Sequence, residues 1–180
     1  MNPNTVTITL HVVSSLDGFI ASKDNSVSWM DSPEDAYPEG VSEYNAGAPV
    51  DIDCFLLGSR TYEHALQLGW PYGDTPTYVV TNRQLPSTRK SVAFYSGELP
   101  KLVDDVLAPR YRNIWLVGGA MLCQSFLGLG LVDEIRLSVA PVLLGGGLRL
   151  FGDPGIEMRW HLKGVVAYKT GFVELLYRRQ

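Results

Sequence analysis

The chain has 180 residues, of which 46% are hydrophobic and 19% are charged, as in an ordinary globular protein. Its net charge of -4 gives no basic footprint for nucleic acid, and no apolar stretch reaches the roughly 18 residues of a membrane span. No export signal is visible, so we expect one cytoplasmic domain over residues 1–180 with no nucleic-acid or membrane partner. In that compartment Cys54 and Cys123 are expected to be buried free thiols.

The N-terminal quarter of the chain predicts one strand and one short helix. Apolar residues alternate over residues 5–13, which predicts a strand, and the Asp-Gly pair at 17–18 predicts a turn after it. Ser32 is typical of a helix N-cap, but Pro38 follows too soon for a long helix.

The remaining chain alternates strands with helices and then ends in strands. Strands are predicted over 51–58, 75–81, 91–95, 113–117 and 131–144, and helices over 59–69, 98–108 and about 120–128. Residues 158–168 and 171–179 flank a hairpin turn. Alternation implies parallel pairing, so we expect an α/β fold with a mixed, mainly parallel sheet, flanking helices and a C-terminal antiparallel hairpin.

Small and basic residues follow three of these strands, at one edge of the predicted sheet. They are Gly58, Ser59, Arg60 and Thr61; Thr81, Asn82 and Arg83; and Gly118 and Gly119. Helix N-termini attract phosphate, and arginine matches phosphate oxygens in bidentate fashion. Three such strand ends indicate a ligand with several phosphates, such as a dinucleotide. Gly58 alone is also compatible with a simple turn, and Arg83 with a solvated surface residue.

Other chemistries have little support in the sequence. His11, His64 and His161 are isolated and lack metal-ligand spacing, so we expect no metal site. Neither a nucleophile elbow nor a P-loop is present. Hydride transfer needs neither feature, because the cofactor carries the chemistry.

Five segments span nearly the whole chain, and they are SLDGFIA, LLGSRTYE, VVTNR, WLVGGAMLCQSFL and LVDEIRLSVAPVLLGGGLRLF. They occur in the order seen in the dihydrofolate reductase fold family, which includes the reductase domain of riboflavin biosynthesis. The chain therefore resembles this family. The resemblance implies a dihydrofolate reductase-like fold, NADPH as cofactor, a small-molecule substrate and a homodimer.

The resemblance also implies which residues contact NADPH. Ser59, Arg60, Thr61, Asn82 and Arg83 would meet the phosphates on the adenine side. Gly118, Gly119 and Ala120 would lie under the pyrophosphate, with a cis peptide between the glycines, and Val13, Ile20 and Ala21 would line the nicotinamide end. The expected cofactor set further includes Gly58, Thr81, Val117, Met121 and Leu122.

The segment SVSWMDSPED resembles the one with which riboflavin reductases hold the ribose phosphate of their substrate. Trp29 and Ser32 are therefore substrate candidates, although Trp29 is also compatible with an ordinary core aromatic. Ala36 stands where those reductases carry an arginine, and Val117 where they usually carry a glutamate. The resemblance thus leaves the substrate open between a pyrimidine-like and a pterin-like ring.

Asp17, Glu34 and Asp35 are the candidate catalytic residues. Asp17 is also compatible with a simple turn former of the Asp-Gly pair, and the other two are also typical first-turn helix acids. Tyr37 and Tyr62 are alternative proton donors.

The expected function is an NADPH-dependent oxidoreductase resembling 5-amino-6-(5-phosphoribosylamino)uracil reductase. The alternatives are a dihydrofolate reductase-type pterin reductase and a non-catalytic NADP-binding module.

Overall fold

A computed structural model describes residues 6–31, 37–41, 51–87, 89–152 and 157–180. Its main sheet has eight strands in the order β5-β4-β3-β6-β1-β7-β10-β9, and β2 and β8 form a second, two-stranded sheet. The strands from β5 to β1 pair in parallel, whereas β10 pairs antiparallel with both β7 and β9. The mixed, mainly parallel sheet with a C-terminal antiparallel hairpin is therefore confirmed.

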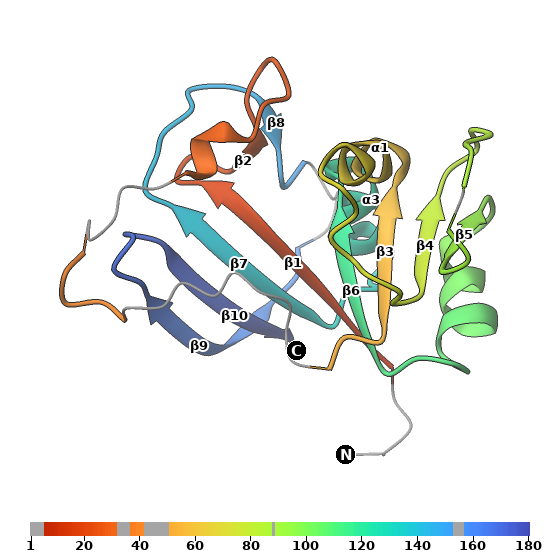
Figure 1. Ribbon diagram of the computed structural model, residues 1–180. Helices are drawn as coiled ribbons and strands as arrows, with labels where there is room; N and C mark the ends of the chain where they lie inside the picture. The colour runs from red at the N-terminus through yellow and green to blue at the C-terminus, as the bar shows by residue number, and fades with distance from the viewer. Residues whose placement is uncertain (1–5, 32–36, 42–50, 88, 153–156) are drawn as a thin grey trace. The chain divides into compact units, whose positions relative to one another are not determined.

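The described residues fall into two compact units, one within Met1–Leu10 and Ala48–Asp133 and the other within His11–Gly47 and Glu134–Gln180. The first unit contains the start of β1 (Thr7–Ser15), β3 (Cys54–Gly58), α1 (Ser59–Gln67), β4 (Thr77–Val80), β5 (Val92–Tyr95), α2 (Leu99–Lys101), the π-helical turn η2 (Leu102–Leu107), β6 (Asn113–Gly118) and α3 (Ala120–Gly128). Every strand and helix predicted for this unit is present. In Figure 1, β3 and β4 run side by side toward the end of the sheet where α1 begins.

The core of the first unit lies on both faces of its parallel strands. Leu56 and Leu57 on β3, Val79 on β4 and Leu116 on β6 are all fully buried. Strands covered on both faces read as continuous apolar runs, as the sequence of β3 does. Cys54 and Cys123 are buried and not bonded to each other, as predicted.

The second unit contains the rest of β1, β2 (Phe19–Ala21), the 3-10 turn η1 (Ser28–Met30), β7 (Glu134–Ala140), β8 (Leu148–Arg149), β9 (Trp160–Ala167) and β10 (Val173–Arg179). The predicted strand over 131–144 is shorter than expected, and β2 and β8 were not expected at all. One of the three consecutive glycines before β8, Gly147, is required by its surroundings. Its φ is +147°, and a Cβ there would lie 2.1 Å from the Ala21 carbonyl oxygen, so only glycine fits beside β2.

A buried polar cluster lies in the sheet of the second unit. Glu174 on β10 pairs with Ser138 on β7, and the Glu174 carboxylate accepts a 2.8 Å ion-pair contact from Arg136. Burial, followed by the charge of Arg136, lowers the pKa of His11 from 6.5 to about 4. His11 is therefore neutral in the folded protein near neutral pH. Separately, no helix in the described ranges is both long and apolar enough to cross a membrane.

Candidate functional site

The carboxyl ends of β3 and β6 lie against each other in the first unit. An ideal Cβ on Gly58 would lie 3.5 Å from the Gly119 amide nitrogen and 3.6 Å from the Gly118 carbonyl oxygen. A Cβ on Gly119 would lie 3.5 Å from the Thr61 hydroxyl oxygen. Two of the predicted strand ends thus lie close together, and a side chain at Gly58 would contact the Gly118–Gly119 backbone.

Both helices that start at these strand ends have open N-termini. α1 follows Gly58 and α3 follows Gly119, each in an extended N-cap conformation. No side chain of the described residues caps either helix, and neither first turn contains an acid. The first N–H groups of such helices lack intrahelical partners and carry the positive end of the dipole, so this surface favours an anion.

The Gly118–Gly119 peptide bond is cis, as the resemblance implied. Gly118 has a φ of +125°, a conformation that residues with a side chain rarely adopt. The preceding Val117 packs against the buried apolar cluster that lies under α1. In the first turns of α3, Leu122 is buried, whereas Met121 is 76% exposed.

Three polar contacts connect the loop after β4 to its surroundings. The Arg83 N–H donates to the Thr81 hydroxyl oxygen over 3.0 Å, which makes a compact turn. The Tyr62 hydroxyl on α1 donates to the Pro86 carbonyl over 2.8 Å. The Arg83 guanidinium donates to both carboxylate oxygens of Glu63 on α1, over 2.9 and 2.6 Å. The third predicted strand end is therefore held against α1. We call residues 58–61, 81–83 and 118–120 the strand-end loops.

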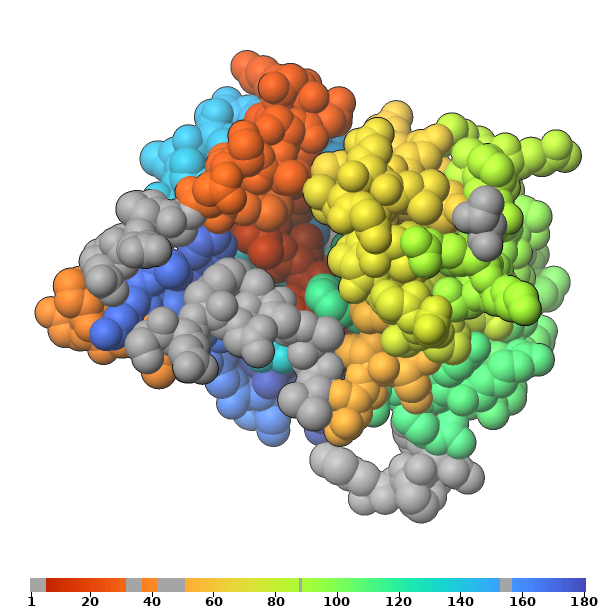
Figure 2. All heavy atoms as spheres, viewed as in Figure 1, coloured from red at the N-terminus to blue at the C-terminus, as the bar shows by residue number. Residues whose placement is uncertain are grey.

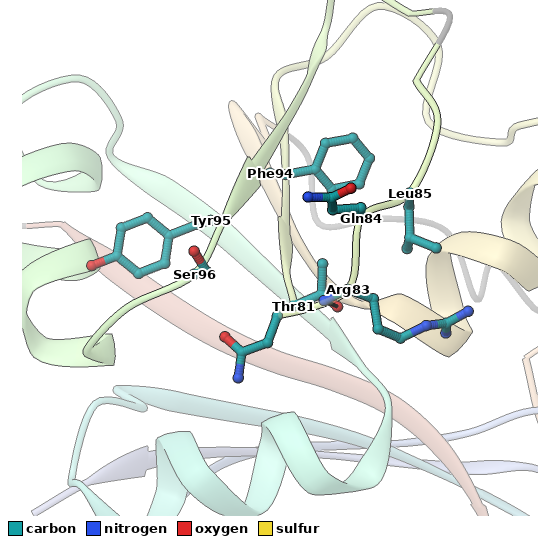
Figure 3. A pocket seen from close by; sticks show the side chains of 8 residues that line it. Thr81, Arg83, Gln84, Leu85, Phe94, Tyr95 and Ser96 are labelled. Atoms are coloured by element: carbon teal, nitrogen blue, oxygen red, sulfur yellow. Dashed lines mark hydrogen bonds between the residues drawn. The ribbon is translucent and has the colours of Figure 1, made fainter.

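A hollow of about 410 Å³ opens beside the β4 loop. It is lined by Thr81, Asn82, Arg83, Gln84, Leu85, Phe94, Tyr95 and Ser96. Figure 3 shows Phe94 beside Gln84, with Tyr95 directed to the opposite side of β5. In Figure 2 the yellow-green part of the chain, which contains the loop after β4, is visible at the surface. The hollow thus combines an aromatic ring with polar side chains and an arginine.

Sequence reasoning missed Phe94, Gln84 and Glu63 as residues of this region. A signal for Phe94 was available, because β5 was predicted and parallel strands end at the same edge of a sheet. Glu63 offered no such signal. Its partner Arg83 is 20 residues away, and only the fold brings the two together.

The predicted residues of the second unit have separate surroundings. Val13 and Trp29 pack against the buried cluster of Ala140, Tyr168 and Phe172. The Trp29 indole nitrogen is buried and has no hydrogen-bond partner among the described residues. Ile20 and Ala21 lie on β2. Ser32, Glu34 and Asp35 lie outside the described residues.

Asp17 is held by three hydrogen bonds. Its carboxylate accepts one from the Ser15 hydroxyl over 2.6 Å and one each from the N–H groups of Leu144 and Gly145, over 3.1 and 2.7 Å. The Ser15 bond is the largest cause that lowers the pKa of Asp17 to about 2, and the two backbone bonds add to it. An ionised carboxylate has no proton to donate near neutral pH, so this geometry favours a positioning role.

The strand order and the strand-end loops define a dihydrofolate reductase-like α/β domain. More particularly, the sequence matches the model of the RibD C-terminal domain over residues 6–173, and the chain belongs to this family.

The chain is also similar to individual known proteins, in sequence or in fold. The Bacillus subtilis (strain 168) protein YwjB is 33% identical over 172 residues, which cover 94% of this chain and 96% of YwjB. Riboflavin biosynthesis protein RibD of Corynebacterium ammoniagenes is 26% identical over 162 residues, which cover 82% of this chain and 46% of RibD. The crystal structure of a Shewanella sp. PV-4 protein superimposes with a TM-score of 0.80 at 23% identity and covers 98% of this chain and 99% of that one. The structural likeness concerns the fold.

Proposed function

We propose that this chain is an NADPH-dependent reductase that resembles 5-amino-6-(5-phosphoribosylamino)uracil reductase and transfers hydride to a C=N or C=O bond of a pyrimidine- or pterin-like substrate. One observation carries the proposal. Two uncapped helix N-termini lie close together at a single sheet edge, around Gly58, Thr61 and Gly119. Membership of the RibD C-terminal domain family supports a reductase.

The strand-end loops suit a dinucleotide diphosphate. Backbone N–H groups at the starts of α1 and α3 can donate to phosphate oxygens, and the glycines admit a close approach. The side chains of Ser59 and Thr61 add hydroxyl donors next to the same helix start. These residues would hold the diphosphate, with Gly118, Gly119 and Ala120 beneath it.

The hollow beside the β4 loop suits the adenosine end. Leu85 and Phe94 provide apolar surface for a purine ring, while Asn82 and Gln84 provide polar groups at its rim. Arg83 places a guanidinium where a ribose 2′-phosphate could pair with it. This arrangement supports NADPH as the cofactor.

When bound, NADPH would supply the hydride. The chain itself would orient the substrate, and one proton would be delivered to the reduced product at the same site. Val13, Ile20 and Ala21 remain the proposed contacts of the nicotinamide, and Trp29 and Ser32 those of the substrate. Glu34, Asp35 or water would complete the protonation. Asp17 would keep the turn before β2 bound to the Leu144–Gly145 backbone.

A two-step assay tests this proposal. Nicotinamide fluorescence is first followed while NADPH is added to the protein, and then NADPH oxidation is followed with a panel of pyrimidines and pterins. Saturable binding followed by steady oxidation with one ring class is the expected result. Binding without oxidation of any member would indicate a non-catalytic NADP-binding module, and no binding would refute the proposal.

A further inference from the structure

The carboxylate of Glu63 accepts two hydrogen bonds from the guanidinium of Arg83, over 2.9 and 2.6 Å, so the two side chains form a bidentate ion pair. Glu63 lies on α1, one turn after the strand-end loop at 58–61. Hydrogen bonds from Arg83, together with the charges of Arg83 and Arg60, lower the pKa of Glu63. Glu63 is therefore an anion at neutral pH, bonded to the arginine that lines the hollow proposed for the adenosine end.

The pair lies where a competing anion can reach it. The side chains of Arg83 and Glu63 are 53% and 41% exposed, so water can solvate both groups when they separate. Exposed ion pairs of this kind are weak, because water solvates both charged groups and salt screens their attraction. Separating the two side chains therefore costs little free energy, and a competing anion can reach Arg83.

A carboxylate and a phosphate bind a guanidinium in the same way, by accepting two parallel N–H bonds along one of its edges. Glu63 accepts from both Nη groups of Arg83, so a ribose 2′-phosphate that binds this edge competes with Glu63. An ionised Glu63 that stays nearby also repels the phosphate. A free ribose 2′-hydroxyl has the opposite preference, because it can donate a hydrogen bond to a carboxylate, as in NAD-binding sites.

We propose that Glu63 is a specificity-determining residue that sets the balance between 2′-phosphorylated and unphosphorylated dinucleotides. It competes with the 2′-phosphate for Arg83 and accepts a hydrogen bond from the 2′-hydroxyl. This inference rests on the proposed dinucleotide function. We therefore expect the wild-type chain to discriminate against NADH less strongly than a chain that has Arg83 but lacks Glu63.

The test compares Glu63→Gln with the wild type by titrating NADPH and NADH, and then the fragments 2′,5′-ADP and 5′-AMP. Glutamine keeps the length and helix propensity of the side chain while removing its charge. We expect NADPH and 2′,5′-ADP to bind about fivefold tighter, the upper range of an exposed ion pair. NADH and 5′-AMP should bind no tighter than before. Glu157→Gln is the control, because it removes an equally charged, exposed carboxylate from a pair with Arg159 in the second unit.

A second variant separates competition for Arg83 from a general loss of charge. In an Arg83→Gln background, Glu63→Gln should lose most of its gain in 2′,5′-ADP affinity, because the contested guanidinium is absent. If the wild type binds dinucleotide and Glu63→Gln has the same ratio of NADPH affinity to NADH affinity as the wild type, the role of Glu63 is refuted while the proposed function stands. If the wild type binds neither dinucleotide, the proposed function fails and this assignment fails with it.

Discussion

Alanine substitutions at Gly118, the last residue of β6, and at the adjacent Gly119 should have different effects on stability and on cofactor binding. Gly118 has a φ of +125°, so alanine there is strained, although its Cβ would meet only the Cys123 sulfur at 3.5 Å. Gly119 has a φ of −76° and a ψ of −169°, which any residue adopts. Its Cβ would make an ordinary 3.5 Å contact with the Thr61 hydroxyl.

The magnitudes follow from these differences. Gly118→Ala should lower the free energy of unfolding by about 1–3 kcal/mol, the usual cost of a non-glycine residue in a sparsely populated backbone region. Gly119→Ala should leave it unchanged or raise it by up to about 1 kcal/mol, because alanine restricts the unfolded chain. If a cofactor phosphate binds to this backbone, the methyl group added in Gly119→Ala prevents at least one charge-assisted hydrogen bond between a backbone N–H and the phosphate. Such bonds contribute about 1.5–3 kcal/mol, so NADPH should bind about tenfold to a hundredfold more weakly.

Two measurements check this pair of variants. Urea unfolding gives the free energies, and nicotinamide fluorescence gives the NADPH affinities. The bulkier Gly119→Val should abolish NADPH binding in a protein that still folds. Wild-type NADPH affinity in Gly119→Val would show that the glycine pair serves only as a turn. Unchanged stability of Gly118→Ala would refute the argument from its backbone conformation.

Three further substitutions test other parts of the structure. Arg83→Ala should weaken NADPH about tenfold and NADH much less, since a charged hydrogen bond to the 2′-phosphate is lost; equal losses, or a similar loss in the exposed control Arg110→Ala, would contradict that role. Tyr62→Phe removes the bond to the Pro86 carbonyl and should lower the free energy of unfolding by about 1 kcal/mol in urea, with weaker NADPH binding as the β4 loop loosens; wild-type values for both would argue against this anchor. His11 has its folded pKa lowered from 6.5 to about 4, so the unfolded chain binds its proton first and stability should fall as pH decreases from 6.5 to 4. In His11→Gln that part of the slope should vanish, and an unchanged pH profile of thermal unfolding would contradict the assignment.

The strand-end loops could be predicted because their signal is local and repeated. Each of β3, β4 and β6 is an apolar run followed at once by small or basic residues, and parallel strands carry their ends to one edge. The short strands β2 and β8 gave no such signal. Two or three residues cannot display an alternating pattern, and the need for Gly147 arises from its contact with Ala21, far away in sequence.

The long-range polar contacts of the site were equally inaccessible from sequence. The Asp-Gly pair at 17–18 was recognised as a turn, and Gly18 has the expected positive φ of 80°. The bonds from Leu144 and Gly145 that hold the Asp17 carboxylate come from residues 127 and 128 positions away. In the same way, the position of Arg83 at a strand end could be predicted, whereas its pairing with Glu63 depends on how α1 packs beside β4.

The most direct test of the account is an NMR titration of the isotope-labelled protein with NADPH. The account predicts saturable shifts that concentrate in the backbone amides of residues 58–61, 81–83 and 118–120, because these N–H groups would face the phosphates. Absence of saturable shifts, or saturable shifts that leave all three strand-end loops unaffected, would contradict it.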